Sequence, residues 1–192
     1  MKSIARSFLI YWNNYRLKRK MPRMIPCFIG KDGKPIKNTS VSSSTFIDYP
    51  QNLTLGEGVY IGHHNFLEAS NELIIEEGCQ ITTFVTITTH SSHQSIRLYG
   101  KSYAGAEMKG YIKGNIRIGK FTFIGPHSTI MPNTNIGKGS LIAAYSYVQG
   151  EFPDFSILAG NPAKVIGDTR TKDSALLEKY PELKPLYDAW AK

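Results

Sequence analysis

A branched aliphatic residue recurs at every sixth position through most of this 192-residue chain. Glycine directly follows five of these residues, and the series is broken only by a two-residue slip and one long interruption. A period of six fits neither a helix, with about 3.6 residues per turn, nor a strand that alternates every second residue. The thirteen positions are Leu55, Ile61, Leu67, Ile75, Ile81, Ile87, Ile112, Ile118, Ile124, Ile130, Ile136, Ile142 and Val148.

The period instead predicts a prism whose sides are short strands. Each strand points one aliphatic side chain inward, and glycine, asparagine or small residues form the corners. Three sides complete a coil of about 18 residues, and successive coils stack through parallel backbone hydrogen bonds. The segment 112–153 holds seven such hexapeptides without interruption. We therefore expect an all-β fold, a parallel β-helix, whereas a β-sandwich would show alternation and irregular turn spacing.

The flanks of the repeat differ from it in composition. Residues 1–45 begin with aromatic and aliphatic residues at helical spacing and continue as an arm rich in Pro, Gly, Lys and Ser. We expect an amphipathic helix and basic arm there, and the β-helix domain over 46–167. The tail, 168–192, reads as short helices over Asp173–Lys179 and from Pro181 onward.

The net charge of +8 belongs to the start of the chain. Residues 1–37 carry ten basic residues and one acid, whereas the remainder is close to neutral. The repeat therefore lacks the basic surface of a nucleic-acid-binding protein. Residues 1–23 could rest on an anionic membrane surface, or could pack against the protein with their charges in water. No apolar run reaches the length of a membrane-spanning helix.

The cysteines give little sign of special chemistry. Cys27 and Cys79 lie far apart, without metal-ligand spacing, and are too few for a disulfide framework. This usage indicates a reducing compartment, and together with the absence of a signal peptide it predicts a cytoplasmic protein.

The one interruption of the repeat is the first candidate for function. A regular solenoid has no structural need for a loop over 91–111. His90 directly precedes it, and imidazole titrates near neutrality, so His90 could act as a general base. A surface histidine at the end of a strand is the alternative.

Three Ile-Gly pairs and the segment Ile157–Ile166, with the sequence ILAGNPAKVI, resemble the terminal coils of hexapeptide-repeat acyltransferases. The resemblance covers about residues 50–167. It extends to galactoside, maltose and virginiamycin acetyltransferases and to bacterial polysaccharide O-acetyltransferases. It implies a left-handed β-helix, acetyl-CoA as donor, and a homotrimer with active sites between subunits.

The resemblance also implies roles for individual residues. His90 matches the family's catalytic histidine, and His93 matches a second histidine that could shape the acceptor pocket or be an ordinary polar loop residue. Further candidates for acceptor binding are Glu68, Asn65, Arg97 and Phe123. Small residues at corners would let the thin arm of the cofactor approach the backbone, and Lys164 could face a phosphate. The implied cofactor residues are Gly125, Ala143, Ala144, Gly160, Asn161, Pro162 and Lys164.

Together these features predict an acetyl-CoA-dependent O-acetyltransferase that acts on a sugar hydroxyl, in bacterial surface polysaccharide synthesis. Transfer would be direct, without an acyl-enzyme. N-acetylation of an amino sugar is the alternative. A non-catalytic or zinc-binding β-helix is a different class. His90 and His93 could contribute two zinc ligands, but no third is evident in the sequence, so we expect no metal.

Overall fold

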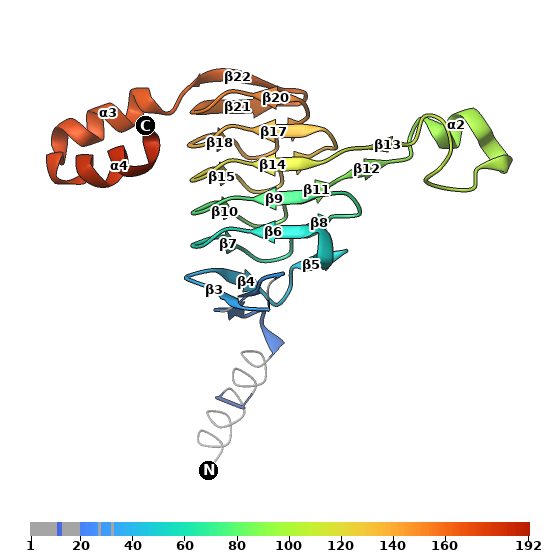
Figure 1. Cartoon of the computed structure of the whole chain (residues 1–192), viewed down its shortest axis with the longest axis horizontal. Coiled ribbons are helices and arrows are strands. Elements are labelled where there is room, and N and C mark those ends of the chain that lie inside the picture. The colour runs from blue at the N-terminus through green and yellow to red at the C-terminus, as the bar shows by residue number, and fades with distance from the viewer. Residues whose placement is uncertain (1–10, 13–19, 27, 32) are drawn as a thin grey trace, which may run out of the picture.

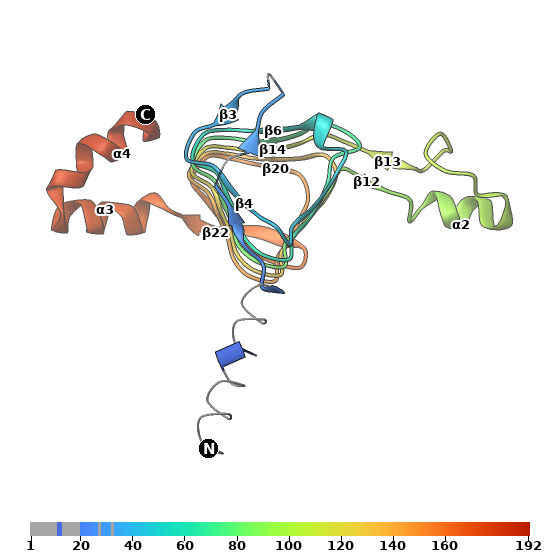
Figure 2. The same ribbon diagram turned by 90° about the horizontal axis from the view of Figure 1, so that it is seen from below.

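The computed structural model describes residues 11–12, 20–26, 28–31 and 33–192. Parallel strands stack into a triangular β-solenoid (Figures 1 and 2), which confirms the predicted fold class. Most of the predicted N-terminal helix falls outside the described residues. No helix among the described residues is long and apolar enough to cross a membrane.

Each side of the solenoid is one parallel sheet. The first face consists of β4 (Ser40–Ser42), β7 (Tyr60–Ile61), β10 (Gln80–Ile81), β15 (Phe123–Ile124), β18 (Leu141–Ile142) and β21 (Ser156–Gly160). The second face consists of β5 (Phe46–Asp48), β8 (Phe66–Glu68), β11 (Thr86–Thr88), β16 (Thr129–Ile130) and β19 (Tyr147–Val148). The third face consists of β6 (Leu53–Leu55), β9 (Leu73–Ile75), β14 (Ile116–Ile118), β17 (Thr134–Ile136) and β20 (Glu151–Phe152).

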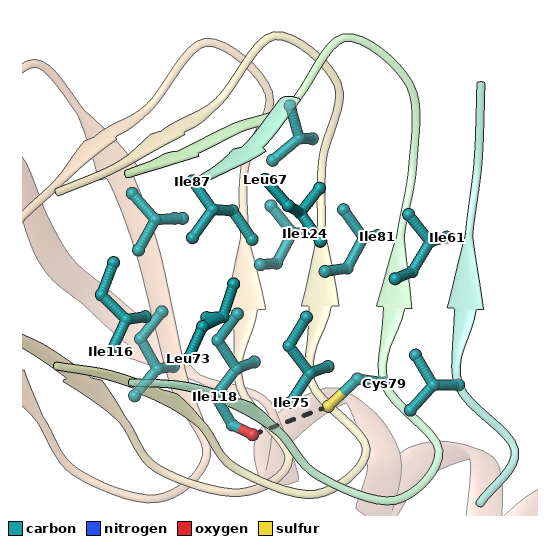
Figure 3. Packing of buried hydrophobic residues seen from close by; sticks show 14 of the residues in the cluster. Ile61, Leu67, Leu73, Ile75, Cys79, Ile81, Ile87, Ile116, Ile118 and Ile124 are labelled. Atoms are coloured by element: carbon teal, nitrogen blue, oxygen red, sulfur yellow. Dashed lines mark hydrogen bonds between the residues drawn. The ribbon is translucent and has the colours of Figure 1, made fainter. Parts of the chain in front are cut away.

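The aliphatic repeat forms the core, as the period predicts. Ile61, Ile81 and Ile124 occupy successive rungs of the first face and are fully buried (Figure 3). Because each inward side chain packs on the coils above and below it, the solenoid has one continuous hydrophobic interior.

One position of the repeat was assigned wrongly. Ile112 is only half-buried and lies on β13 (Ile112–Lys113), which pairs antiparallel with β12 (His90–Ser91) to form the stem of the loop. The third face resumes at Ile116, because β14 pairs with β9 there. The seven uninterrupted hexapeptides predicted from residue 112 therefore do not all belong to the solenoid.

The coils also differ in length. Ile142 pairs with Ile124, so the later coil has the predicted 18 residues, but Ile81 pairs with Ile61, which gives 20. The additional residues lie between the second and third faces, at the corner that follows Glu68. This enlarged corner is the one from which the loop leaves.

Both ends of the solenoid carry additional elements. At the start, β1 (Met24–Ile25) pairs antiparallel with β4, and β2 (Phe28–Ile29) pairs with β3 (Pro35–Ile36), so parallel stacking begins at β4, before residue 46. At the far end, β22 (Ala163–Asp168) folds back on β21. The last elements project to one side (Figure 2): α3 (Arg170–Lys179), η3 (Pro181–Leu183) and α4 (Lys184–Ala191).

Four aromatic rings occupy left-handed corner positions between the first and second faces. His64, Phe84, His127 and Tyr145 have φ angles of 59°, 57°, 59° and 61°. Their rings stack in that order, with centroids 5.2, 5.0 and 4.8 Å apart. Small residues were expected at such corners, but stacking between coils offsets the modest strain of a left-handed ring-bearing residue.

Candidate active site

The protruding loop leaves the solenoid where the second face meets the third. β12 and β13 form its two-stranded stem, in which His90 pairs with Lys113, and beyond it lie α2 (Ser95–Tyr99) and η2 (Gly100–Ser102) (Figures 1 and 2). His90 therefore stands at the base of the loop. About a third of its side chain is exposed, which leaves the imidazole open to solvent.

Glu68 lies one coil below His90 and is 2% exposed. Its Oε2 is 2.8 Å from His90 Nδ1 and accepts hydrogen bonds from the Thr89 backbone N–H at 2.9 Å and the Thr89 hydroxyl at 3.0 Å. Oε2 also accepts a bond from the Thr88 hydroxyl at 3.3 Å, while Oε1 accepts one from the Ser70 N–H at 2.6 Å. The carboxylate is therefore fixed by the backbone of two coils.

Hydrogen bonding decides the charge of Glu68. Burial opposes ionisation, but the hydrogen bonds from Ser70 and Thr89 and the nearby His90 outweigh it and hold the pKa of this carboxyl below its usual value. An ionised carboxylate can only accept hydrogen bonds, so His90 Nδ1 must donate to it. Nε2 of the neutral ring then carries the free lone pair.

Two further side chains fix the imidazole. The Ser70 hydroxyl lies 3.2 Å from His90 Nδ1. The ring of Tyr111, at the end of the loop, stacks on the imidazole with centroids 5.5 Å apart and planes 9° from parallel. Burial and, to a lesser extent, Tyr103 and Glu68 raise the pKa of the Tyr111 phenol, so it stays neutral. Glu68 and Ser70 therefore fix the Nδ1 edge of the His90 ring, and Tyr111 packs on one of its faces.

Sequence reasoning missed Ser70 and Tyr111. Ser70 could have been found from the coil length, because it precedes His90 by the 20 residues that separate Ile61 from Ile81. Tyr111 could not, since the path of the loop decides which of its side chains returns to the solenoid.

The loop residues predicted to bind the acceptor contact one another. His93 Nδ1 lies 2.7 Å from the Ser91 hydroxyl, and the Arg97 guanidinium donates to the His93 carbonyl. Both side chains are exposed, and none of these bonds reaches His90.

Asn65 and Phe123 lie elsewhere. The Asn65 amide donates to the Gly62 and Thr82 carbonyls, and its oxygen accepts from the Val85 N–H, so a buried corner uses the whole side chain. Phe123, on the first face, lines a groove of about 660 Å³ beneath the C-terminal helices. The structure therefore brings together His90 and Glu68, but neither Asn65 nor Phe123 joins them within this chain.

Comparison with known proteins identifies the family. The model of the bacterial transferase hexapeptide (six repeats) matches residues 115–150. A Saccharomyces cerevisiae protein named as an acetyltransferase is 32% identical over 144 residues, which cover 74% of this chain and 69% of that protein. The chain belongs to the hexapeptide-repeat acetyltransferases. The family predicted from the three Ile-Gly pairs and the segment Ile157–Ile166 is therefore confirmed.

Other members of this acetyltransferase family show how far the likeness extends. A Mycobacterium tuberculosis protein, also named as an acetyltransferase, is 27% identical, and the match covers 90% of this chain and 61% of that protein. Among solved structures, a galactoside acetyltransferase in complex with coenzyme A aligns with a TM-score of 0.62 and 26% identity. That alignment covers 72% of this chain and 66% of the other.

The cofactor residues implied by the family lie in line at one corner, between the first and second faces, except Lys164, which lies on β22 opposite Ala159. Ile124, Ile142 and Leu158 share a rung position, and the implied residues follow each of them. A Cβ on Gly125 would lie 2.7 Å from the Ala144 backbone nitrogen, so this corner admits no side chain there. Ala144 and the turn at Gly160, Asn161 and Pro162 are exposed, as is Lys164. A narrow chain could therefore approach the backbone along this corner.

Two other chemistries find less support. Burial raises the pKa of the Cys79 thiol to about 12, and its Sγ lies 3.1 Å from the Gly119 carbonyl oxygen, to which it donates, and 3.9 Å from that of Ile118, so this thiol is no nucleophile (Figure 3). Cys27 lies outside the described residues. Within the part of the chain that the structure describes, no group of three or more His, Cys, Asp or Glu side chains could hold a metal.

Proposed function

We propose that this chain is an acetyl-CoA-dependent O-acetyltransferase of the cytoplasm that acts on a sugar hydroxyl in bacterial surface polysaccharide synthesis. The observation that carries the proposal is the buried Glu68 carboxylate, 2.8 Å from His90 Nδ1. It leaves the opposite ring nitrogen, Nε2, as a base at the foot of the loop. Glu68 then acts as a positioning residue for His90 rather than as the acceptor-binding residue expected from the sequence.

The reaction needs one base that can return its proton. Acetyl-CoA would supply an activated thioester. His90 Nε2 removes the proton of the acceptor hydroxyl as its oxygen bonds to the thioester carbonyl carbon, and the imidazolium then protonates the sulfur as the carbon–sulfur bond breaks. The ionised Glu68 stabilises the transient imidazolium. No side chain is acylated, in agreement with the buried and protonated Cys79.

The proposed site requires more than one copy of the chain. The corner that carries Gly125 and Ala144 is separated from the corner of His90 by the second face. The seven residues 124–130 would span about 20 Å if they were fully extended, and the corner at His127 shortens that distance. Acyl transfer needs reacting atoms about 3 Å apart. A homotrimer that sets the cofactor corner of one subunit beside His90 of the next meets this need.

A thiol-release assay tests donor and acceptor together. Acetyl-CoA is incubated with the protein and a panel of sugars, and free thiol and acetylated product are both measured. The proposal predicts product only with an acceptor that carries a free hydroxyl. Product confined to amino sugars would instead establish N-acetylation, and absence of both acetyl-CoA binding and thiol release would refute the proposed enzyme.

A further inference from the structure

A polar groove of about 590 Å³ lies on the third face, beside the stem of the loop. This face looks toward the reader in Figure 1, where β12 and β13 leave from the edge of β9 and β14. The volume lies within the range of sites for small molecules. The residues that characterise this third-face groove are Asn71, Asn115, Arg117, Asn133, Asn135 and Glu151.

The third-face groove adjoins His90 through a short series of hydrogen bonds. Asn71, on its rim, donates from Nδ2 to the Thr89 carbonyl at 3.0 Å, and the Gly114 N–H donates to the same oxygen at 2.9 Å. The Asn71 amide also donates to the Ser70 hydroxyl at 3.4 Å, and that hydroxyl contacts His90. Asn71 and Gly114, which line the groove, are therefore connected to the proposed base through Thr89 and Ser70.

Asn135 presents an unused hydrogen-bond acceptor. Its Oδ1 is buried and has no partner among the described residues. Its Nδ2 donates to Glu151 Oε2 at 2.9 Å, which fixes the orientation of the amide. A buried polar atom without a partner is uncommon and carries a free-energy cost. A hydroxyl in the groove would remove that cost by donating to Oδ1 once the atoms that cover this oxygen move aside.

The cations of the third-face groove already have partners. Arg117 Nε donates to Glu76 Oε1 at 2.9 Å, and Lys113 Nζ lies 2.7 Å from Glu107 Oε1. The Glu72 and Glu151 carboxylates also line the groove. An anionic ligand would therefore meet two neutralised cations and two like charges. The lining of amides and carboxylates favours a neutral molecule rich in hydroxyls.

We propose that the third-face groove binds the acceptor, and that the acceptor is a neutral sugar whose hydroxyl donates to Asn135. This rests on the proposed function for the role of His90, but it adds the place and the charge class of the substrate. It also moves acceptor recognition from the loop residues His93 and Arg97 to the outward side chains of β14, β17 and β20.

Binding without turnover tests this proposal separately from catalysis. The full-length His90→Ala variant, without acetyl-CoA, is titrated with methyl glucopyranoside, methyl galactopyranoside and maltose, and with glucuronate and galacturonate as acidic counterparts. We expect saturable binding of a neutral sugar, and binding of the acidic counterpart at least ten-fold weaker. Equal or preferred binding of the acidic sugars would overturn the charge class.

Asn135→Leu in the same background tests the groove. Loss of one hydrogen bond predicts a three- to ten-fold weaker sugar affinity, on the order expected for a neutral pair. Gln80→Leu, on the exposed first face, is the control and should leave affinity unchanged. Asn135→Ser repeats the test if the leucine disturbs the strand, which a thermal melt would show. Unchanged affinity in both variants, or a changed oligomeric state, would overturn the proposal.

These results separate the two proposals. Sugar binding that weakens with Asn135→Leu, but without thiol release by the unmodified protein, would retain the groove and refute the transferase. Thiol release by the unmodified protein, together with an Asn135→Leu variant whose KM for the sugar is unchanged, would retain the transferase and refute the groove.

Discussion

Glu68→Gln is the substitution that separates a positioning carboxylate from an ordinary buried one. Both oxygens of Glu68 accept backbone N–H groups, Oε1 from Ser70 at 2.6 Å and Oε2 from Thr89 at 2.9 Å. An amide has one acceptor and one donor end. Whichever way the substituted amide turns, its NH₂ group must face a backbone N–H in this corner. The two neighbouring threonine hydroxyls can reorient, but the backbone donors cannot.

The expected loss of stability follows from the number of backbone donors left without an acceptor. One backbone donor left unsatisfied in a buried corner costs about 1–3 kcal/mol. For a domain of this size that corresponds to a fall in melting temperature of about 2–12 °C. Catalysis should fall further, because a neutral amide in either orientation no longer stabilises the imidazolium, and an amide that donates to His90 Nδ1 also places the ring proton on Nε2 and removes the base. We expect a loss of about 10²- to 10⁴-fold in kcat, as when a histidine is held in the wrong tautomer.

The assay combines a thermal melt with thiol release at saturating acetyl-CoA. Glu57→Gln, an exposed carboxylate on an earlier coil, is the matched control and should change neither quantity. A Glu68→Gln variant with the melting temperature and kcat of the unmodified protein would refute both the hydrogen-bond count and the positioning role. Loss of stability with unchanged kcat would retain the count and refute the role in catalysis.

Three other measurements test the fold and its charges. Ile118→Ala, in the core, should lower the free energy of unfolding by about 2–5 kcal/mol, whereas Ile166→Ala, 65% exposed, should change it by less than about 0.5 kcal/mol; equal effects in chemical denaturation would contradict the assigned core. Gly125→Ala places a Cβ 2.7 Å from backbone and should cost about 1–3 kcal/mol by the same measurement, so an unchanged midpoint would contradict the close packing of that corner. Because the fold lowers the pKa of Glu68, the stabilising contribution of this carboxylate is complete above the ordinary glutamate value of 4.5 and is lost as the pH falls below it. The free energy of unfolding, measured by denaturation between pH 6 and pH 3, should therefore fall less steeply in Glu68→Gln than in the unmodified protein. Parallel pH curves for the two proteins would contradict this.

The hexapeptide period was enough to predict the solenoid and nearly all of its inward side chains. It failed at Ile112, because an aliphatic residue in the stem happens to continue the count while the chain is still outside the solenoid. It also gave coils of one length, whereas the enlarged corner after Glu68 adds residues to the early coils. The local sequence sets the six-residue period, but pairing between coils determines where each side of the solenoid begins.

The site was predicted less completely for the same reason. His90 could be singled out by its place before the loop and by its family motif. Glu68 was expected to meet the acceptor, because its contact with His90 depends on which coil lies above it. Asn135 and Tyr111 gave no signal, since one is an ordinary polar residue of a strand and the other returns from an irregular loop. The ring column that ends at Tyr145 likewise exists only between coils.

The ratio of kcat/KM between the unmodified protein and His90→Ala, on the best sugar acceptor, tests the central claim most directly. Glu57→Ala, an exposed side chain at the corner between the third and first faces, is the control. The account predicts a fall of about 10²- to 10⁴-fold for His90→Ala, as for removal of a general base, and little change for the control. Acetyl transfer by His90→Ala at the rate of the unmodified protein would contradict it.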